Sequence, residues 1–306
     1  MSRFFALLCI FPMLFPSGCT DIRTRSYAEL LAIRQGEEIS ASIRNIDEDT
    51  WISSDFETML LLPDALESES GKQLSFGHLD LLMLQGETFA PAEKLLSNGL
   101  TAPNCPVLLC APFENMETLG DSDISGKLHS AVENGALPPC SVGEIVGNLE
   151  SRAGMTILPY CRDGELHAAL HDGERLLCVL SEEACRGAVL SDGRSKPLVF
   201  SENGEDTIEI QKCRAEIRLA EQDGTLTISV TLRIRSEQSC AAEAAARSVQ
   251  AFFEETVLKY GADPCFLEES ARRFGVAVPT RQAWRTMLQN AVLQIQTVPL
   301  SAAFRL

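Results

Sequence analysis

Apolar positions in the first half of the chain predict strands and helices in alternation. The segment Leu74–Gly86 is apolar at positions of both parities, which is typical of a strand covered on both faces. A helix is predicted for 87–98, where Pro91 lies near the start, and a second buried strand for 105–111. This order of strand, helix and strand favours an α/β arrangement.

Before residue 74, the apolar and polar positions predict a mixture of short elements. Residues 27–31 have a helical composition, whereas 39–43 alternate between apolar and polar side chains as a strand does. The short apolar run 59–62 ends at Pro63, and 64–71 is predicted to be a polar, acidic surface stretch.

Later elements carry clearer end signals. Ser141 and Glu144 form a capping box, which predicts a helix over 142–149, and Gly154 can close that helix. A hairpin is predicted for 165–180 because two apolar runs flank an Asp-Gly turn. A short helix should follow it.

The last hundred residues predict a sheet and helices. Alternation at 213–219 and 228–234 predicts an antiparallel pair with one solvated face. Three further elements follow: a long helix at 241–260, a helix that begins near Thr280, and a final strand at 292–298 that returns to the sheet.

Together these patterns predict an α+β, multi-domain fold: mixed β-sheets flanked by helices, with a C-terminal antiparallel sheet packed on a long helix. A stretch rich in Gly, Ser, Asp and Asn at 190–206 predicts a domain boundary. We therefore expect an N-terminal α/β region at 19–203, which can divide again near 137, and a C-terminal α+β domain at 204–306.

Composition and charge narrow the function classes. The chain has 306 residues, of which 45% are hydrophobic and 23% charged, as in ordinary globular proteins. Its formal net charge of -17 argues against nucleic-acid binding, which needs a basic surface. The same charge disfavours a folded domain that lies flat on anionic lipid.

The first residues resemble an export signal. Arg3 precedes the uncharged apolar run 4–15, and small residues then lead to Cys19. We predict that 1–18 is a lipoprotein signal peptide and that Cys19 receives the lipid, although Pro16 stands where such signals usually have Leu. Cleavage without lipidation, or anchoring by an uncleaved signal, remain the alternatives.

The other cysteines and histidines give little evidence of a site. Eleven cysteines include Cys9 in the signal and the candidate lipid site, and the rest form no close pairs of the zinc-binding kind. We expect most of them to be buried free thiols. His167 and His171 could recruit a metal with Cys161, but packing roles are favoured for them and for His78.

No signature of catalysis stands out either. Glu182 and Glu183 follow a capping Ser181 and suit a helix N-terminus better than acid–base chemistry. Trp284 suits a core anchor. Neither a phosphate loop nor a nucleophile elbow is present in the sequence. We therefore expect no enzyme activity, no cofactor and no metal.

Much of the chain resembles the Ger(x)C family, the C subunits of spore germinant receptors. Four features carry the resemblance: the strand entered through Phe76–Leu79 and left at Gly86-Glu87; Leu158-Pro159 with the hairpin end Gly173–Leu176; Glu182-Glu183 with a return to Gly187; and Tyr260–Asp263 with Trp284 before a final strand. Thr20-Asp21 departs from the family's usual Trp-Asp pair, and the segment before residue 74 is short for the family.

The resemblance implies a lipoprotein on the outer face of the spore inner membrane. Its implied partners are integral membrane subunits of the A and B types, with which it takes part in nutrient-triggered germination. The family is not known for catalysis, and its folds are α+β. An alternative is an extracytoplasmic lipoprotein that binds a small nutrient itself, which a deep polar pocket would favour. An exported hydrolase is a third hypothesis.

Overall fold

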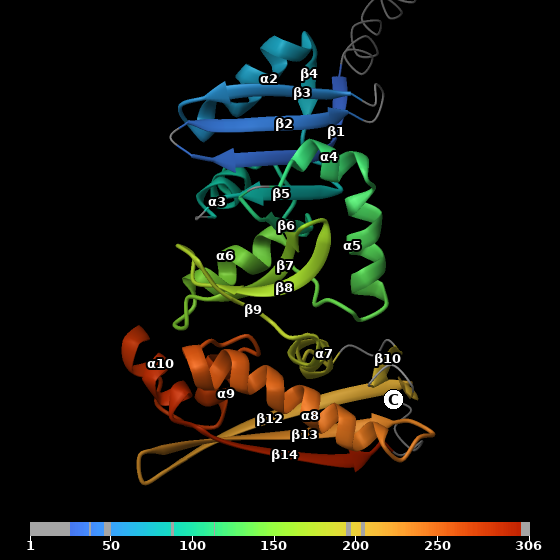
Figure 1. Cartoon of the computed structure of the whole chain (residues 1–306). Helices are drawn as coiled ribbons and strands as arrows, with labels where there is room; N and C mark the ends of the chain where they lie inside the picture. Colours follow the sequence, from blue (N-terminus) through green and yellow to red (C-terminus); the bar gives the residue numbers. More distant parts are fainter. Residues whose placement is uncertain are drawn as a thin grey trace, which may run out of the picture.

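The computed structural model describes residues 25–36, 38–45, 50–86, 89–112, 114–193, 197–202 and 206–300. They form a large sheet with helices on both faces, a separate two-stranded sheet and, below the large sheet in Figure 1, a three-stranded sheet covered by helices. The strands are β1 (Arg25–Gln35), β2 (Ile39–Asn45), β3 (Trp51–Phe56), β4 (Gln73–Ser75), β5 (Leu81–Gln85), β6 (Val107–Cys110), β7 (Thr156–Arg162), β8 (Glu165–His171), β9 (Leu176–Val179), β10 (Leu198–Glu202), β11 (Asp206–Ile210), β12 (Lys212–Gln222), β13 (Thr225–Arg235) and β14 (Val292–Pro299). The helices are η3 (Met59–Leu61), α2 (Leu62–Ser70), α3 (Ala90–Ser97), α4 (Met116–Asp121), α5 (Ile124–Glu133), α6 (Val142–Glu150), α7 (Glu182–Ser191), α8 (Ala241–Phe253), η4 (Glu254–Leu258), α9 (Leu267–Arg273) and α10 (Arg281–Gln289).

Parallel strands occupy the centre of the large sheet. β1 pairs in parallel with β5, β5 with β6, and β6 with β7. Antiparallel strands extend this centre on both sides, with β2 and β3 beyond β1 and with β8 and β9 beyond β7. The short strand β4 pairs in parallel with the first residues of β1. The sheet order is therefore β3-β2-β1-β5-β6-β7-β8-β9.

Strand β5 shows why the centre of this sheet is apolar throughout. All of its residues are buried. Leu82 and Leu84 pack with helices α2, α3 and α6, whereas Leu81 and Met83 pack on the opposite side with α4 and α5. Each such side chain contributes roughly 1.5–3 kcal/mol when it is fully buried. The prediction of a strand covered on both faces is confirmed for β5.

The C-terminal sheet has one buried and one solvated face. β12 and β13 form an antiparallel hairpin across Asp223-Gly224, and both turn residues have positive φ (52° and 76°), as a two-residue hairpin turn requires. Along β13, Ile228 and Val230 are buried beside α8, while Thr231 on the other face accepts a hydrogen bond from the Gln296 side chain (2.7 Å). β14 joins β13 in parallel.

Helix α8 carries the apolar stripe that covers this sheet. Val249, Phe252 and Phe253 are buried, and the helix continues through the π-helical turn η4 until Gly261, whose φ of 70° ends it. Thr256 in that turn donates a hydrogen bond to the Phe252 carbonyl (2.6 Å). The predicted helix at 241–260 is thus confirmed, with a π-helical turn inside it.

A close contact between α7 and α8 holds the C-terminal part against the large sheet. A Cβ atom on Gly187 of α7 would lie 2.0 Å from the Ser248 carbonyl oxygen and 2.6 Å from Cβ of Phe252. Only glycine lets the two backbones approach this closely. At the start of α7, the Glu255 carboxylate accepts hydrogen bonds from the Ser181 amide (3.0 Å) and hydroxyl (2.6 Å). Figure 1 shows α7 between the large sheet and α8.

The structure confirms the predicted fold class, which combines mixed sheets, flanking helices and a C-terminal sheet on a long helix. The capping box at Ser141 starts α6 as predicted, and the hairpin of β8 and β9 and the return of β14 are also confirmed. Because β14 is parallel to β13, however, the C-terminal sheet is mixed rather than wholly antiparallel. The division at 203/204 stays a prediction.

The prediction of helical structure at 27–31 is wrong, because these residues lie in β1. Leu30 and Leu31 are buried on opposite faces of the sheet, between β2 and β5. Pairing on both edges of the strand therefore overrides the helical composition of this segment.

Three element ends also differ from the predictions. Pro63 lies in the first turn of α2 instead of ending an apolar run, so the predicted surface stretch 64–71 is mostly helical. The predicted strand at 74–86 is divided into β4 and β5 by a turn at Gly77-His78. Helix α6 ends at Glu150 with an extended Ser151, so Gly154 does not close it.

We predict that Gly187→Ala lowers the free energy of unfolding by about 3 kcal/mol or more, because its methyl group would push α7 away from α8. The matched control is Gly147→Ala in α6, where no atom lies within 4 Å of the added Cβ. That variant should be as stable as the wild type or more stable by up to about 1 kcal/mol. Urea unfolding of the three proteins measures both, and equal stability of Gly187→Ala and the wild type would contradict the contact.

Candidate functional site

The predicted lipid site, Cys19, and the predicted signal at 1–18 lie outside the described residues. The first described residue, Arg25, begins β1 and pairs with Gln73 of β4. Five residues lie between Cys19 and Arg25, so the six residue steps span about 20 Å at full extension. Among the described residues, no helix is long and apolar enough to cross a membrane.

The structure does not gather the histidines considered from the sequence. His78 is exposed in the turn before β5, and its ring lies 6.0 Å from that of Tyr27. His167 lies 4.0 Å from a carboxylate oxygen of Glu165. Within the described ranges, no group of three or more His, Cys, Asp or Glu side chains is placed to hold a metal ion.

His171 serves the turn between β8 and β9. Its ring is buried edge-on against Phe89 (4.6 Å between centroids), and its Nδ1 accepts a hydrogen bond from the Gly173 amide (3.0 Å). Burial lowers the pKa of His171 to about 4, although the nearby Asp172 carboxylate acts in the opposite direction. A neutral ring fits this structural role.

The other candidates also have structural explanations. Glu182 and Glu183 lie in the first turn of α7, whose Ser181 hydroxyl accepts from the Ala184 amide (3.1 Å). Trp284 is fully buried. Most described cysteines are buried free thiols as predicted, and burial raises their pKa values, for example to about 12 for Cys213. They behave as small hydrophobic residues.

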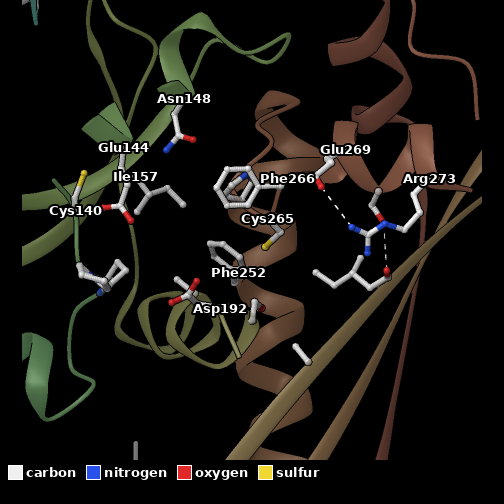
Figure 2. A pocket seen from close by; sticks show the side chains of 18 residues that line it. Cys140, Glu144, Asn148, Ile157, Asp192, Phe252, Cys265, Phe266, Glu269 and Arg273 are labelled. Carbon is white, nitrogen blue, oxygen red and sulfur yellow. Dashed lines mark hydrogen bonds and ion pairs between the residues drawn. The ribbon is translucent and has the colours of Figure 1, made fainter. Parts of the chain in front are cut away.

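A cleft of about 350 Å³ lies where the C-terminal part meets the large-sheet part. Helix α6 and strand β7 line one side, α7 and α8 line the floor, and α9 with the loop before it lines the other side (Figure 2). The charged side chains at its rim already have partners. Glu144 accepts from the Ser141 amide in the capping box (2.9 Å), and Glu269 lies 3.4 Å from the Arg273 guanidinium.

Phe266 is the unusual residue of this cleft. Its backbone adopts the left-handed conformation (φ 54°, ψ 41°), which is rare for a bulky side chain, and 62% of the residue is exposed. Figure 2 shows its ring directed across the cleft toward the side that carries Asn148 and Ile157. Strain of this kind costs about 1–3 kcal/mol and is found most often at functional positions.

Asp263 holds the backbone that presents Phe266. Its buried carboxylate accepts hydrogen bonds from the Leu267 and Glu268 amides, the latter at 2.7 Å, and so caps α9 in place of Phe266. Burial raises the pKa of Asp263 to about 6, while these two hydrogen bonds act in the opposite direction. The cap therefore contains an acid that titrates near neutral pH.

Two arginines of α10 bind carbonyls at and just after the end of α6. Arg281 donates to the carbonyls of Leu149 (3.2 Å) and Ser151 (3.1 Å), and Arg285 donates from Nε to the Ala153 carbonyl (2.6 Å). These carbonyls lie at the end of α6, where no further helical turn can satisfy them. These hydrogen bonds thereby join the C-terminal part to the end of α6.

This arrangement suits the binding of an apolar side chain. The cleft offers an exposed aromatic ring, and the acids Glu144 and Glu269 are occupied by local hydrogen bonds and an ion pair. Phe266 could not be singled out from the sequence, because a lone Phe beside a helix usually packs in the core. Its left-handed backbone is visible only in the structure.

We predict that Phe266→Asn raises the free energy of unfolding by about 1 kcal/mol, because Asn tolerates the left-handed conformation. The control is Phe274→Asn, which replaces another exposed ring (47%) at a residue with φ of -95° and should bring no such gain. Chemical unfolding of both variants tests this. A loss of stability in Phe266→Asn would mean that the ring contributes to folding.

A second prediction concerns pH. Because the pKa of Asp263 is raised from 3.8 to about 6 on folding, its protonated form is favoured in the native state. The stabilisation is complete below about pH 4 and is lost as the pH rises through 6, a change of about 3 kcal/mol at 1.36 kcal/mol per unit. Relative to Asp263→Asn, the wild type should lose that amount between pH 4 and pH 7 in unfolding experiments. A constant difference would contradict the assignment.

Neither a family model nor a curated protein sequence matches this chain. Among solved structures, the crystal structure of the GerBC protein matches 89% of this chain and 97% of its own, with a TM-score of 0.50 and 12% sequence identity. At that identity the likeness establishes the fold alone. It confirms the fold that the resemblance to the Ger(x)C family implied, so the chain has a fold like that of GerBC.

Proposed function

We propose that this chain is a lipid-anchored, C-subunit-like component of a spore germinant receptor. In this role it binds integral membrane subunits of the A and B types on the outer face of the spore inner membrane and takes part in nutrient-triggered germination. The observation that carries the proposal is the likeness to GerBC over almost the whole of both chains, together with the sequence resemblance to the Ger(x)C family. The proposal assigns the chain no reaction of its own.

The anchor in this proposal is the lipid on Cys19. Two acyl chains are enough for stable attachment, since each buried methylene contributes about 0.8 kcal/mol. The short span from Cys19 to Arg25 would keep the β1–β4 end of the large sheet within about 20 Å of the membrane. The net charge of -17 would repel the folded part from anionic lipid, so that it would stand away from the surface.

The cleft around Phe266 is the surface that we expect a partner subunit to use. Exposed aromatic residues are enriched at protein interfaces, where burial of the ring supplies much of the affinity. Phe274, at the other end of α9, exposes a second ring that does not line the cleft. The carboxylates of Glu144 and Glu269 at the rim already have hydrogen-bond or ion-pair partners. This favours assembly over direct capture of a charged nutrient in this cleft.

The test uses a spore-forming host that expresses the tagged chain, its Cys19→Ala variant and the Phe266→Ala variant. Intact mass should show that the wild type begins at residue 19 with added diacylglycerol, and Cys19→Ala should leave the membrane fraction almost completely. Capture from detergent-solubilised spore membranes should recover A- and B-type subunits with the wild type. Phe266→Ala should recover at least about tenfold less, because an interface aromatic can contribute 2 kcal/mol or more.

The outcomes separate the steps of the proposal. An unlipidated chain, or one that keeps residues 1–18, would remove the anchor. Wild-type capture without any integral membrane receptor subunit would contradict the assembly role itself. Normal capture by Phe266→Ala would contradict only the choice of surface, and Phe274→Ala is the matched control for loss of an exposed ring.

A further inference from the structure

A second cavity, away from the cleft, contains an arginine with an unsatisfied donor. Arg186 of α7 is half-buried, and its Nε atom is buried without a hydrogen-bond partner. The guanidinium carbon lies 4.7 Å from the ring centroid of Phe200 in β10. Within the described part of the chain it forms no ion pair. A buried donor without a partner is unfavourable, and more so when the group is charged.

The cavity beside Arg186 has the size and walls of a small-molecule site. Its volume is about 320 Å³, within the range of ligand pockets, and it lies between the end of α5 and the elements β8, α7 and β10. Apolar side chains supply most of its walls: Leu137, Leu166, Leu180, Leu198 and Phe200. An apolar group could fill this space and bury its surface there.

The charges around the cavity restrict what it can take. A guanidinium is planar and binds a carboxylate through two parallel N–H donors. Glu182, one helical turn before Arg186, also lines the cavity and adds a negative charge. His167 lines it as well, and its Nε2 lies 4.0 Å from Glu165. A dianion such as phosphate would be repelled more strongly by Glu182 than a single carboxylate.

We propose that this cavity binds a small monocarboxylate with an apolar body. The carboxylate forms an ion pair with the guanidinium of Arg186, which has none within the described residues, and the apolar body lies against Leu137, Leu180 and Leu198. The site stands independently of the receptor role proposed above, because its evidence comes from the cavity and its charges alone.

Titration calorimetry of the full-length chain with hexanoate tests the proposal, with hexan-1-ol as the neutral probe of equal length. The wild type should bind hexanoate saturably at a single site, and Arg186→Met should bind it at least tenfold more weakly. Hexan-1-ol should bind both proteins alike. The matched control is Arg175→Met, which removes an exposed arginine paired with Asp172 outside the cavity and should leave hexanoate binding unchanged.

Three binding results would overturn the proposal: no saturable binding of hexanoate by the wild type, equal binding by Arg186→Met, or equal weakening by Arg175→Met. Thermal unfolding without ligand provides a separate test. Since the buried Nε of Arg186 lacks a hydrogen-bond partner in the unliganded protein, the midpoint of Arg186→Met should not fall below that of the wild type. A lower midpoint would mean that the guanidinium supports the fold, which contradicts its role as a ligand group.

Arg186→Lys, which keeps the charge but not the planar donor pair, should weaken hexanoate binding less than Arg186→Met does.

Discussion

The absence of a side chain at Gly187 is the constraint on which the two-part structure depends. It lets α7 lie directly on the backbone of α8, where a Cβ atom would come within 2.0 Å of the Ser248 carbonyl oxygen. Because α7 follows β9 of the large sheet and α8 covers the C-terminal sheet, this contact sets the distance between the two parts. The hydrogen bonds from Ser181 to Glu255 and from Arg281 and Arg285 to the end of α6 then fix their orientation.

Both candidate binding regions depend on the same helix. The end of α7 contributes to the floor of the cleft through Ala188, Ser191 and Asp192, while Arg186 points to the separate cavity beside β10. Each region also contains a feature that lowers the stability of the fold. In the cleft it is the left-handed backbone of Phe266, and in the cavity it is the unpaired donor of Arg186. Such features are typical of positions kept for binding. This is why we propose binding at both places.

Signals within a short stretch of sequence were sufficient to predict the elements that neighbouring residues define by themselves. Alternation predicted the β12–β13 hairpin, and the Ser141–Glu144 capping box predicted where α6 begins. These signals failed at β1, because its pairing with β5 some fifty residues later decides its conformation. They also failed at Pro63, because a proline can begin a helix as well as end an apolar run. The site could not be predicted, since the exposure of Phe266 and the missing partner of Arg186 result from contacts between distant segments.

The central claim is that the chain serves a germinant receptor, and germination itself tests this most directly. Spores that lack the chain, and spores complemented with the wild type, should be mixed with a panel of nutrients while the loss of optical density is followed. The account predicts that the response to at least one nutrient is lost without the chain and is restored by complementation. An unchanged response to every nutrient that triggers the parent spores would contradict it.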